Sequence, residues 1–323
     1  MRAQDVERVC IVGAGTMGAN IAGEFARIGC DVRIADLNQR QLNNGMSILK
    51  NSQKALVDAK CLTQREARCA LKRITWTINI TSACDNIDLL IEAVSENMSL
   101  KKKMFCQFDR LCPKRTVLAS NTSSLSISDI AAATKRPHRV AGMNFWNPSH
   151  IIPLVEVTKG KETSQATAKL LIDVSRRINK RPILVNHDIP GFVGNRLQFA
   201  VFREALHLLS EGIASAEDID AAMTAGPGLR YSLLGPLRTA DLGGLDVFHA
   251  ISGYLFDELS VAKEPPALLS DLVKRKKLGA KTGHGFYKYT KAGVKKTIAQ
   301  RDKVLIEFLR ILKKERAHGQ GST

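Results

Sequence analysis

The stretch RVCIVGAGTMG, residues 8–18, decides the fold. A short apolar run ends in the pattern G-x-G-x-x-G, and a helix-forming stretch continues to about residue 28, where Gly29 is expected to end the helix. Residues 31–35 form a second β-like run. Together these features predict a strand–turn–helix–strand unit, the first part of a doubly wound α/β domain.

The three glycines of this pattern have different physical roles. Gly13 permits the tight turn, Gly15 lets the backbone approach a pyrophosphate, and Gly18 allows the helix and the strand to pack closely. The helix is expected from about Met17, and its N-terminus, next to Thr16, carries free N–H groups and a partial positive charge for the phosphates. The pattern therefore predicts a dinucleotide site at these five residues.

An acidic residue, Asp36, follows the second β-like run, about twenty residues beyond the glycines. We expect its carboxylate to accept hydrogen bonds from the adenosine ribose hydroxyls and to repel a 2′-phosphate, which favours NAD over NADP. Arg33 and Arg40 are close in sequence and weaken this preference slightly. A helix-capping role for Asp36 is the alternative, but it does not explain the glycine spacing.

The length of 323 residues suggests about two domains. Apolar runs such as IDLLIEA and TVLASN are typical of buried parallel strands, whereas the chain after Asn186 is mostly helical in pattern. The predicted fold class is α/β, with a Rossmann NAD-binding domain at residues 1–187 and an all-helical domain at 188–323. The helical domain is expected to contribute to substrate binding and dimerisation.

The formal net charge of +17 favours anionic ligands such as a dinucleotide, a carboxylate or coenzyme A. The charge is spread over several helices, so a solvated basic surface explains it equally well. Aromatic residues make up only 5% of the chain, which leaves no stacking platform for a nucleic acid. We therefore predict a small-molecule substrate and no nucleic-acid partner.

The opening MRAQDVERVC lacks the apolar region of a signal peptide, and no apolar run approaches the roughly 18 residues that span a bilayer. These features predict a cytoplasmic protein without a membrane partner. The seven cysteines include no C-x-x-C pair. We expect them to be reduced and mostly to pack in the interior, and we expect no metal site.

Four further stretches follow the glycine pattern in a distinctive order: ASNTSSLSI, NFWNPSHIIPLVEV, DIPGFVGNRL and GAKTGHGFYKY. With them the chain resembles the 3-hydroxyacyl-CoA dehydrogenase family over about residues 7–290, including its hydroxy-acid dehydrogenase and lambda-crystallin-like branch. The resemblance implies hydride transfer from a 3-hydroxyacyl-CoA or a small 3-hydroxy acid to NAD. It also implies a helical second domain that forms a homodimer.

The resemblance implies roles for individual residues. The family's G-x-H-F-F-N-P matches GMNFWNP, which places Asn144 where the general-base histidine belongs. Glu156 matches the carboxylate that orients this histidine, and Ser123 and Asn195 match residues that hold the substrate oxygen. The implied cofactor contacts are Glu96, Lys101, Asn147 and Lys281.

Asn144 is a chemical departure from the family. Oxidising a secondary alcohol requires removal of the hydroxyl proton, which a neutral imidazole can accept and an amide cannot. His150 lies six residues later and is better explained as a surface or packing residue than as a replacement base. A water held by Glu156 and Asn144 is a second, slower route. The substitution is either a natural divergence or an introduced change, and it leaves open a non-catalytic, NAD-binding or structural role.

Two features point to different substrates. The segment GLRYSLLGP resembles the branch of the family that acts on small hydroxy acids, and its Arg230 could bind a substrate carboxylate through two parallel hydrogen bonds. The basic helical segment with Lys50, Ser52, Lys54 and Lys60 lies where family members bind coenzyme A. Both substrate classes therefore stay open on the sequence alone.

Overall fold

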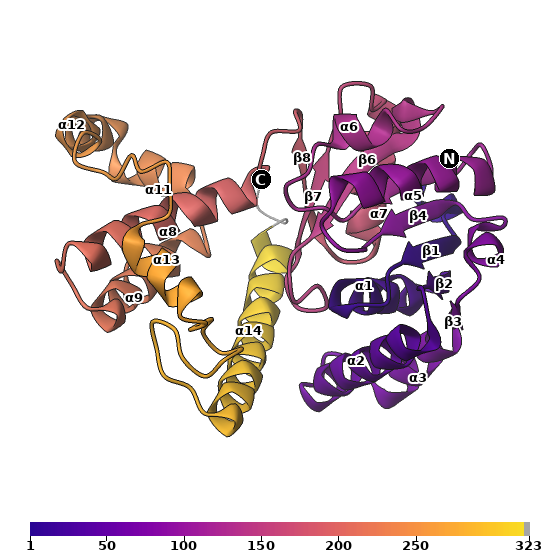
Figure 1. The fold of residues 1–323 in the computed structure, drawn as a ribbon, viewed down its shortest axis with the longest axis horizontal. Helices are drawn as coiled ribbons and strands as arrows, with labels where there is room; N and C mark the ends of the chain where they lie inside the picture. The colour runs from indigo at the N-terminus through magenta and orange to yellow at the C-terminus, as the bar shows by residue number, and fades with distance from the viewer. Residues whose placement is uncertain (320–323) are drawn as a thin grey trace. The chain divides into compact units, whose positions relative to one another are not determined.

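A computed structural model describes residues 1–319, with side chains described up to residue 311. Contacts divide the chain into two compact units, of which the first is Met1–Arg196 and the second begins at Leu197. The first unit is α/β and the second is helical, which confirms the predicted fold class (Figure 1). The predicted domain boundary after residue 187 lies shortly before this division. In the described part of the chain no helix is both long and apolar enough to cross a membrane.

The first unit is built on one eight-stranded sheet with the strand order β3-β2-β1-β4-β5-β6-β7-β8. Neighbouring strands are parallel except β6 and β7, which pair antiparallel. The strands are β1 Arg8–Val12, β2 Asp31–Ala35, β3 Ile74–Thr77, β4 Leu89–Glu92, β5 Val117–Ser120, β6 Val140–Phe145, β7 Leu154–Thr158 and β8 Arg181–Val185. Chain order reverses at β1, so the ends of β1 and β4 form the topological switch point where such sheets bind ligands.

Helices cover both faces of this sheet (Figure 1). One buried cluster joins the strands to α1, α2, α3 and α7, and a second joins them to α4, α5 and α6. The helices are α1 Thr16–Arg27, α2 Gln39–Asp58, α3 Gln64–Lys72, α4 Ile80–Cys84, α5 Met98–Leu111, α6 Ile127–Ala131 and α7 Gln165–Arg177, with 3₁₀ helices at Ala3–Asp5 and Pro137–Arg139. Strands β4, β5 and β6 are buried throughout, as their continuous apolar sequences predict.

The second unit is helical throughout its regular structure. Its helices are α8 Gly194–Ser210, which starts in the first unit, α9 Ala216–Ala225, α10 Pro227–Tyr231, α11 Pro236–Gly243, α12 Leu245–Leu255, α13 Ala267–Lys274 and α14 Lys291–Gly319. Helices α11 and α12 are separated at Gly244, whose φ of 94° ends the first of them. The segment around Arg230 contains the short helix α10.

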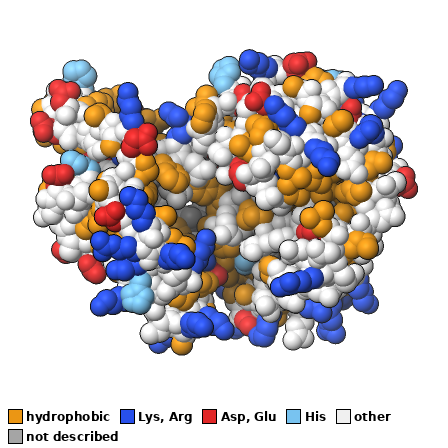
Figure 2. Space-filling model, in the orientation of Figure 1, with side chains coloured by type: hydrophobic (Ala, Val, Ile, Leu, Met, Phe, Trp, Pro, Cys, Tyr) orange, Lys and Arg blue, Asp and Glu red, His pale blue; other side chains and the backbone are white. Residues whose placement is uncertain are grey.

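The cysteines are free thiols, four of them buried. The buried ones are Cys10, Cys30, Cys84 and Cys112, and the exposed ones are Cys61, Cys69 and Cys106. In the described residues no group of three His, Cys, Asp or Glu side chains is arranged to hold a metal ion. Lys and Arg side chains are spread across the visible face (Figure 2).

Candidate active site

The glycine loop after β1 has the shape that a pyrophosphate requires. Gly13 has a φ of 110°, and a Cβ at this position would lie 2.5 Å from the carbonyl oxygen of Ala93 after β4. A Cβ at Gly18 would overlap the carbonyl oxygen of Gly13. By contrast, a Cβ at Gly15 would meet nothing within 4 Å, so this part of the loop is open to a ligand. The steric environment of the three glycines is therefore the one that a dinucleotide-binding loop needs, and the position of the phosphates at the start of α1 remains a prediction.

Asp36 lies after β2 and contacts the glycine loop itself. Its Oδ2 accepts a hydrogen bond of 2.6 Å from the backbone N–H of Ala14, and its Oδ1 accepts one of 2.6 Å from Leu37 N–H. The side chain is thus held at the edge of the loop, where a ribose would follow the pyrophosphate. Its contact with the ribose remains a prediction.

Glu96 and Lys101 belong to a polar network that supports the loop after β5. Lys101 is 1% exposed and pairs with Glu92 at 2.6 Å and with Glu96 at 3.4 Å. Glu96 Oε1 accepts from the hydroxyl of Thr122 at 2.5 Å and from the N–H of Ser123 at 3.2 Å. Lys101 is therefore buried among carboxylates, and Glu96 is the more accessible of the two predicted cofactor contacts. The contacts of Glu96 and Lys101 with the cofactor remain predictions.

Ser123 and Asn195 are brought together although 72 residues separate them. The Asn195 Nδ2 atom donates to the backbone oxygen of Ser123 at 3.2 Å. Among the described residues, none forms a hydrogen bond with the Ser123 hydroxyl. That hydroxyl is consequently available to a substrate oxygen.

Asn144 and Glu156 face each other across the antiparallel pair β6–β7. Directly opposed residues on such strands point to the same face, which brings the two side chains into contact. The Asn144 Nδ2 atom donates to Glu156 Oε2 at 2.8 Å, and both residues are buried. This is the arrangement expected of a base position and its orienting carboxylate, with an amide in place of the base.

Glu156 accepts three further hydrogen bonds. The indole Nε1 of Trp146 donates to Oε2 at 3.1 Å. The backbone N–H groups of Val193 and Gly194, at the start of α8, donate to Oε1 at 3.0 and 2.9 Å. A carboxylate has about four lone-pair positions, so these four donors fill them. The geometry therefore argues against a proton-relaying water held by Glu156.

The loop between β6 and β7 carries Asn147 and His150. Lys180 anchors this loop: its Nζ donates to the carbonyl oxygens of Ser149 and Ile152, and it pairs with Glu24 at 3.4 Å. Burial lowers the pKa of Lys180. Lys180 could not be identified from the sequence, because its partners Ser149 and Glu24 are distant in the chain, whereas Trp146 could have been noticed because it replaces a Phe of the family pattern.

Arg230 and Lys281 belong to the helical unit. Arg230 is exposed on α10, and no described residue forms an ion pair with its guanidinium. Lys281 is exposed in a turn. Their predicted contacts with substrate and cofactor remain predictions.

Comparisons with known proteins agree with this geometry. Residues 8–189 match the model of the 3-hydroxyacyl-CoA dehydrogenase NAD-binding domain, and residues 191–289 match that of the C-terminal domain of the same family. A 3-hydroxybutyryl-CoA dehydrogenase of Clostridioides difficile is 40% identical over 286 residues, which are 88% of this chain and 100% of that protein.

A second relative is similar over more of the chain. The 5-formyl-3-hydroxy-2-methylpyridine 4-carboxylate 5-dehydrogenase of Mesorhizobium japonicum is 33% identical over 307 residues, 95% of this chain and 98% of that protein. A crystal structure of an enzyme of this activity has a TM-score of 0.89 and 32% identity, and it covers 95% of this chain and 99% of its own. The chain is therefore an NAD-dependent oxidoreductase and belongs to the 3-hydroxyacyl-CoA dehydrogenase family.

Proposed function

We propose that this chain is a slow NAD-dependent dehydrogenase of a 3-hydroxyacyl-CoA or a small 3-hydroxy acid. The observation that carries the proposal is the contact between Asn144 and Glu156 in an otherwise complete site. The proposal is further supported by the hydrogen bond from Asn195 to the backbone of Ser123 and by the open backbone at Gly15 in the glycine loop. Only the group that would accept the proton is replaced.

The side chains divide the chemistry between them. NAD, when bound, supplies the hydride acceptor. The Ser123 hydroxyl and the Asn195 amide hold the substrate oxygen. Asn144 can donate a hydrogen bond to the same oxygen through the second N–H of its side-chain amide. An amide takes no proton at neutral pH, so the hydroxyl proton must leave to solvent, and the step is slow.

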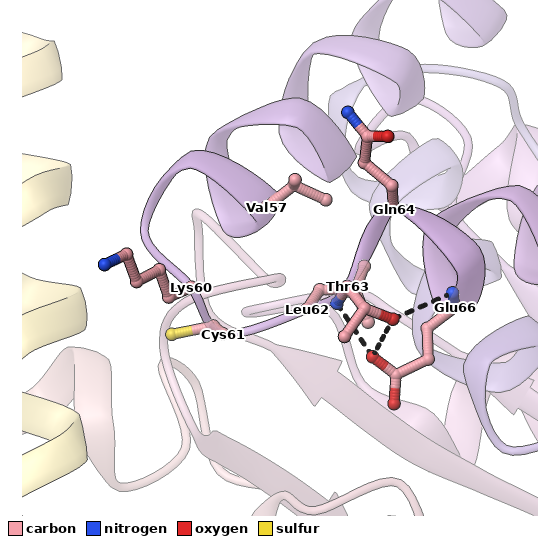
Figure 3. Close-up of a pocket in the computed structure, with 7 residues that line it drawn as sticks. All are labelled: Val57, Lys60, Cys61, Leu62, Thr63, Gln64 and Glu66. Carbon is pink, nitrogen blue, oxygen red and sulfur yellow. Dashed lines mark hydrogen bonds between the residues drawn. The ribbon is translucent and has the colours of Figure 1, made fainter.

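The two substrate classes have separate support. A hollow of about 360 Å³ lies at the turn between α2 and α3, and Lys60 lines it (Figure 3). The turn is rigid, because Thr63 and Glu66 form a capping box with bonds of 2.7–3.2 Å. Lys60 would suit the phosphates of coenzyme A, whereas the unpaired Arg230 would suit a free carboxylate.

The test of the proposal is NADH formation at 340 nm with a panel of 3-hydroxyacyl-CoAs and 3-hydroxy acids. We expect measurable turnover that is about 10²- to 10⁴-fold below that of a dehydrogenase with an intact base, the usual contribution of a positioned general base. Ordinary dehydrogenase rates that are lost in His150→Ala would show that His150 is the base. NAD binding without turnover on any substrate would favour the non-catalytic role.

We further propose that the chain forms a homodimer through its helical unit. Most residues of helix α12 are apolar and none is buried, and Leu245, Phe248 and Tyr254 are among those exposed. A helix of this kind is normally buried, so a second copy is the expected cover.

The seven free thiols support a reducing compartment such as the cytoplasm.

Light scattering after size exclusion should give a molar mass twice that of one chain. Phe248→Glu should shift this mass toward the monomer, because a charge would be buried in the interface. Ile78→Glu, at an exposed apolar residue of the first unit, is the matched control and should leave the mass unchanged. A native chain that stays monomeric at micromolar concentration would contradict the dimer.

A further inference from the structure

Trp146 is a second departure at the candidate site, and it contacts the same oxygen as Asn144. The family pattern G-x-H-F-F-N-P has Phe at this position, whereas the chain has Trp. Phe has no donor, but the indole Nε1 donates to Glu156 Oε2 at 3.1 Å, beside the 2.8 Å bond from Asn144. One carboxylate oxygen therefore holds both residues that differ from the pattern.

The indole ring is held in this place from the other side as well. Trp146 directly follows β6, in which Asn144 lies opposite Glu156, and its indole reaches the same Glu156 oxygen as the Asn144 amide. A Cβ at Gly194 would overlap the Trp146 ring, so the ring packs directly on the glycine backbone at the start of α8. The position of the indole is thus set by a hydrogen bond and by close packing.

We propose that Trp146 is a positioning residue that, together with Asn144, fills the acceptor positions of Glu156 and leaves this carboxylate unable to support a base fully. Backbone N–H groups already occupy Oε1, so only Oε2 faces position 144. Two donors on one oxygen compete for its electron density. A histidine placed at position 144 would share Oε2 with the indole and would be a weaker base than in a site with Phe at position 146.

The main readout of the test is a histidine titration, which does not depend on the proposed function. Only the measurement of kcat/KM rests on that function. Nuclear magnetic resonance of N144H and of N144H/W146F gives the pKa of the introduced histidine by difference from the seven native ones. Removing the competing donor should raise this pKa by about half to one unit, or three- to tenfold in basicity, the size expected for one hydrogen bond. The kcat/KM profile should shift by the same amount.

Trp76, on β3, provides the matched control. It is the other tryptophan of the chain, and no described residue accepts a hydrogen bond from its indole. N144H/W76F should leave the pKa of the introduced histidine unchanged. An equal shift in both double variants, no shift, or a downward shift in N144H/W146F would overturn the proposal.

A second measurement uses the native chain and requires no substitution. The indole N–H of Trp146 should exchange with solvent far more slowly than that of Trp76, because only the first is bonded to a buried carboxylate. Fast exchange at Trp146 would also overturn the proposal. If the histidine pKa shifts as expected but no substrate is turned over, the positioning role stands and the proposed function falls.

Discussion

Asn144→His should accelerate NAD reduction by about 10²- to 10⁴-fold, the usual contribution of a positioned general base. This corresponds to about 3–5 kcal/mol of activation free energy. The gain is expected because Glu156 already lies opposite position 144 and can orient an imidazole in place of the amide. With Trp146 present the gain should fall in the lower part of this range. The measurement is kcat/KM for the substrate panel at several pH values.

The controls separate the base from its surroundings. N144H combined with Glu156→Gln should lose much of the gain, because the ring then lacks its charged partner. NAD affinity, measured by calorimetry, should stay within about twofold throughout, since the glycine loop is unchanged. An N144H variant that binds NAD but gains no rate with any substrate would reject the role of position 144.

Arg230→Met should raise KM for small hydroxy acids by about 30- to 5000-fold if Arg230 binds the substrate carboxylate. Losing one partner of a desolvated, hydrogen-bonded charge pair costs about 2–5 kcal/mol, and each 1.4 kcal/mol is about tenfold. The structural reason is that the guanidinium is exposed on α10 and no described residue forms an ion pair with it. Steady-state kinetics with 3-hydroxy acids and with acyl-CoAs measure the two classes separately.

Arg238→Met is the matched control for this substitution. Arg238 is also exposed, on the neighbouring helix α11, and its removal should leave both KM values unchanged. Activity confined to acyl-CoAs and indifferent to R230M would assign the chain to the acyl-CoA class. A raised KM for small hydroxy acids in R230M would identify Arg230 as the substrate-binding cation, whereas activity with acyl-CoAs alone would favour Lys60.

The first half of the fold could be predicted because its signals are local. The glycine pattern, the helix after it and Asp36 lie within about thirty residues, and the steric constraints of each glycine are visible in the sequence. The strand β7 was not predicted, and it reverses the direction of the sheet beside β6. This reversal is what sets Asn144 against Glu156, so the resemblance alone, and not the residue pattern, paired them in advance.

The remaining contacts of the site could not be predicted, because they join distant segments. Trp146 meets Gly194 and Glu156 only after β6, β7 and α8 have come together. Likewise, the anchoring of the β6–β7 loop by Lys180 depends on burial that no local pattern encodes. The sequence therefore predicts where the candidate site lies, but it does not predict that four donors fill the acceptor positions of Glu156.

The two oxygens of Glu156 bind different parts of the fold, so losing Glu156 and losing the base at position 144 have different consequences. One oxygen holds the base position, whereas the other caps the first turn of α8. Losing the base slows turnover and leaves the helix start intact, but losing the carboxylate also leaves two backbone N–H groups without their acceptor and lowers the stability of the fold. Drift in a lineage released from selection for turnover would then remove the imidazole first and keep the glutamate. A glutamate retained at this position is therefore explained by its role in folding as well as by its role in catalysis.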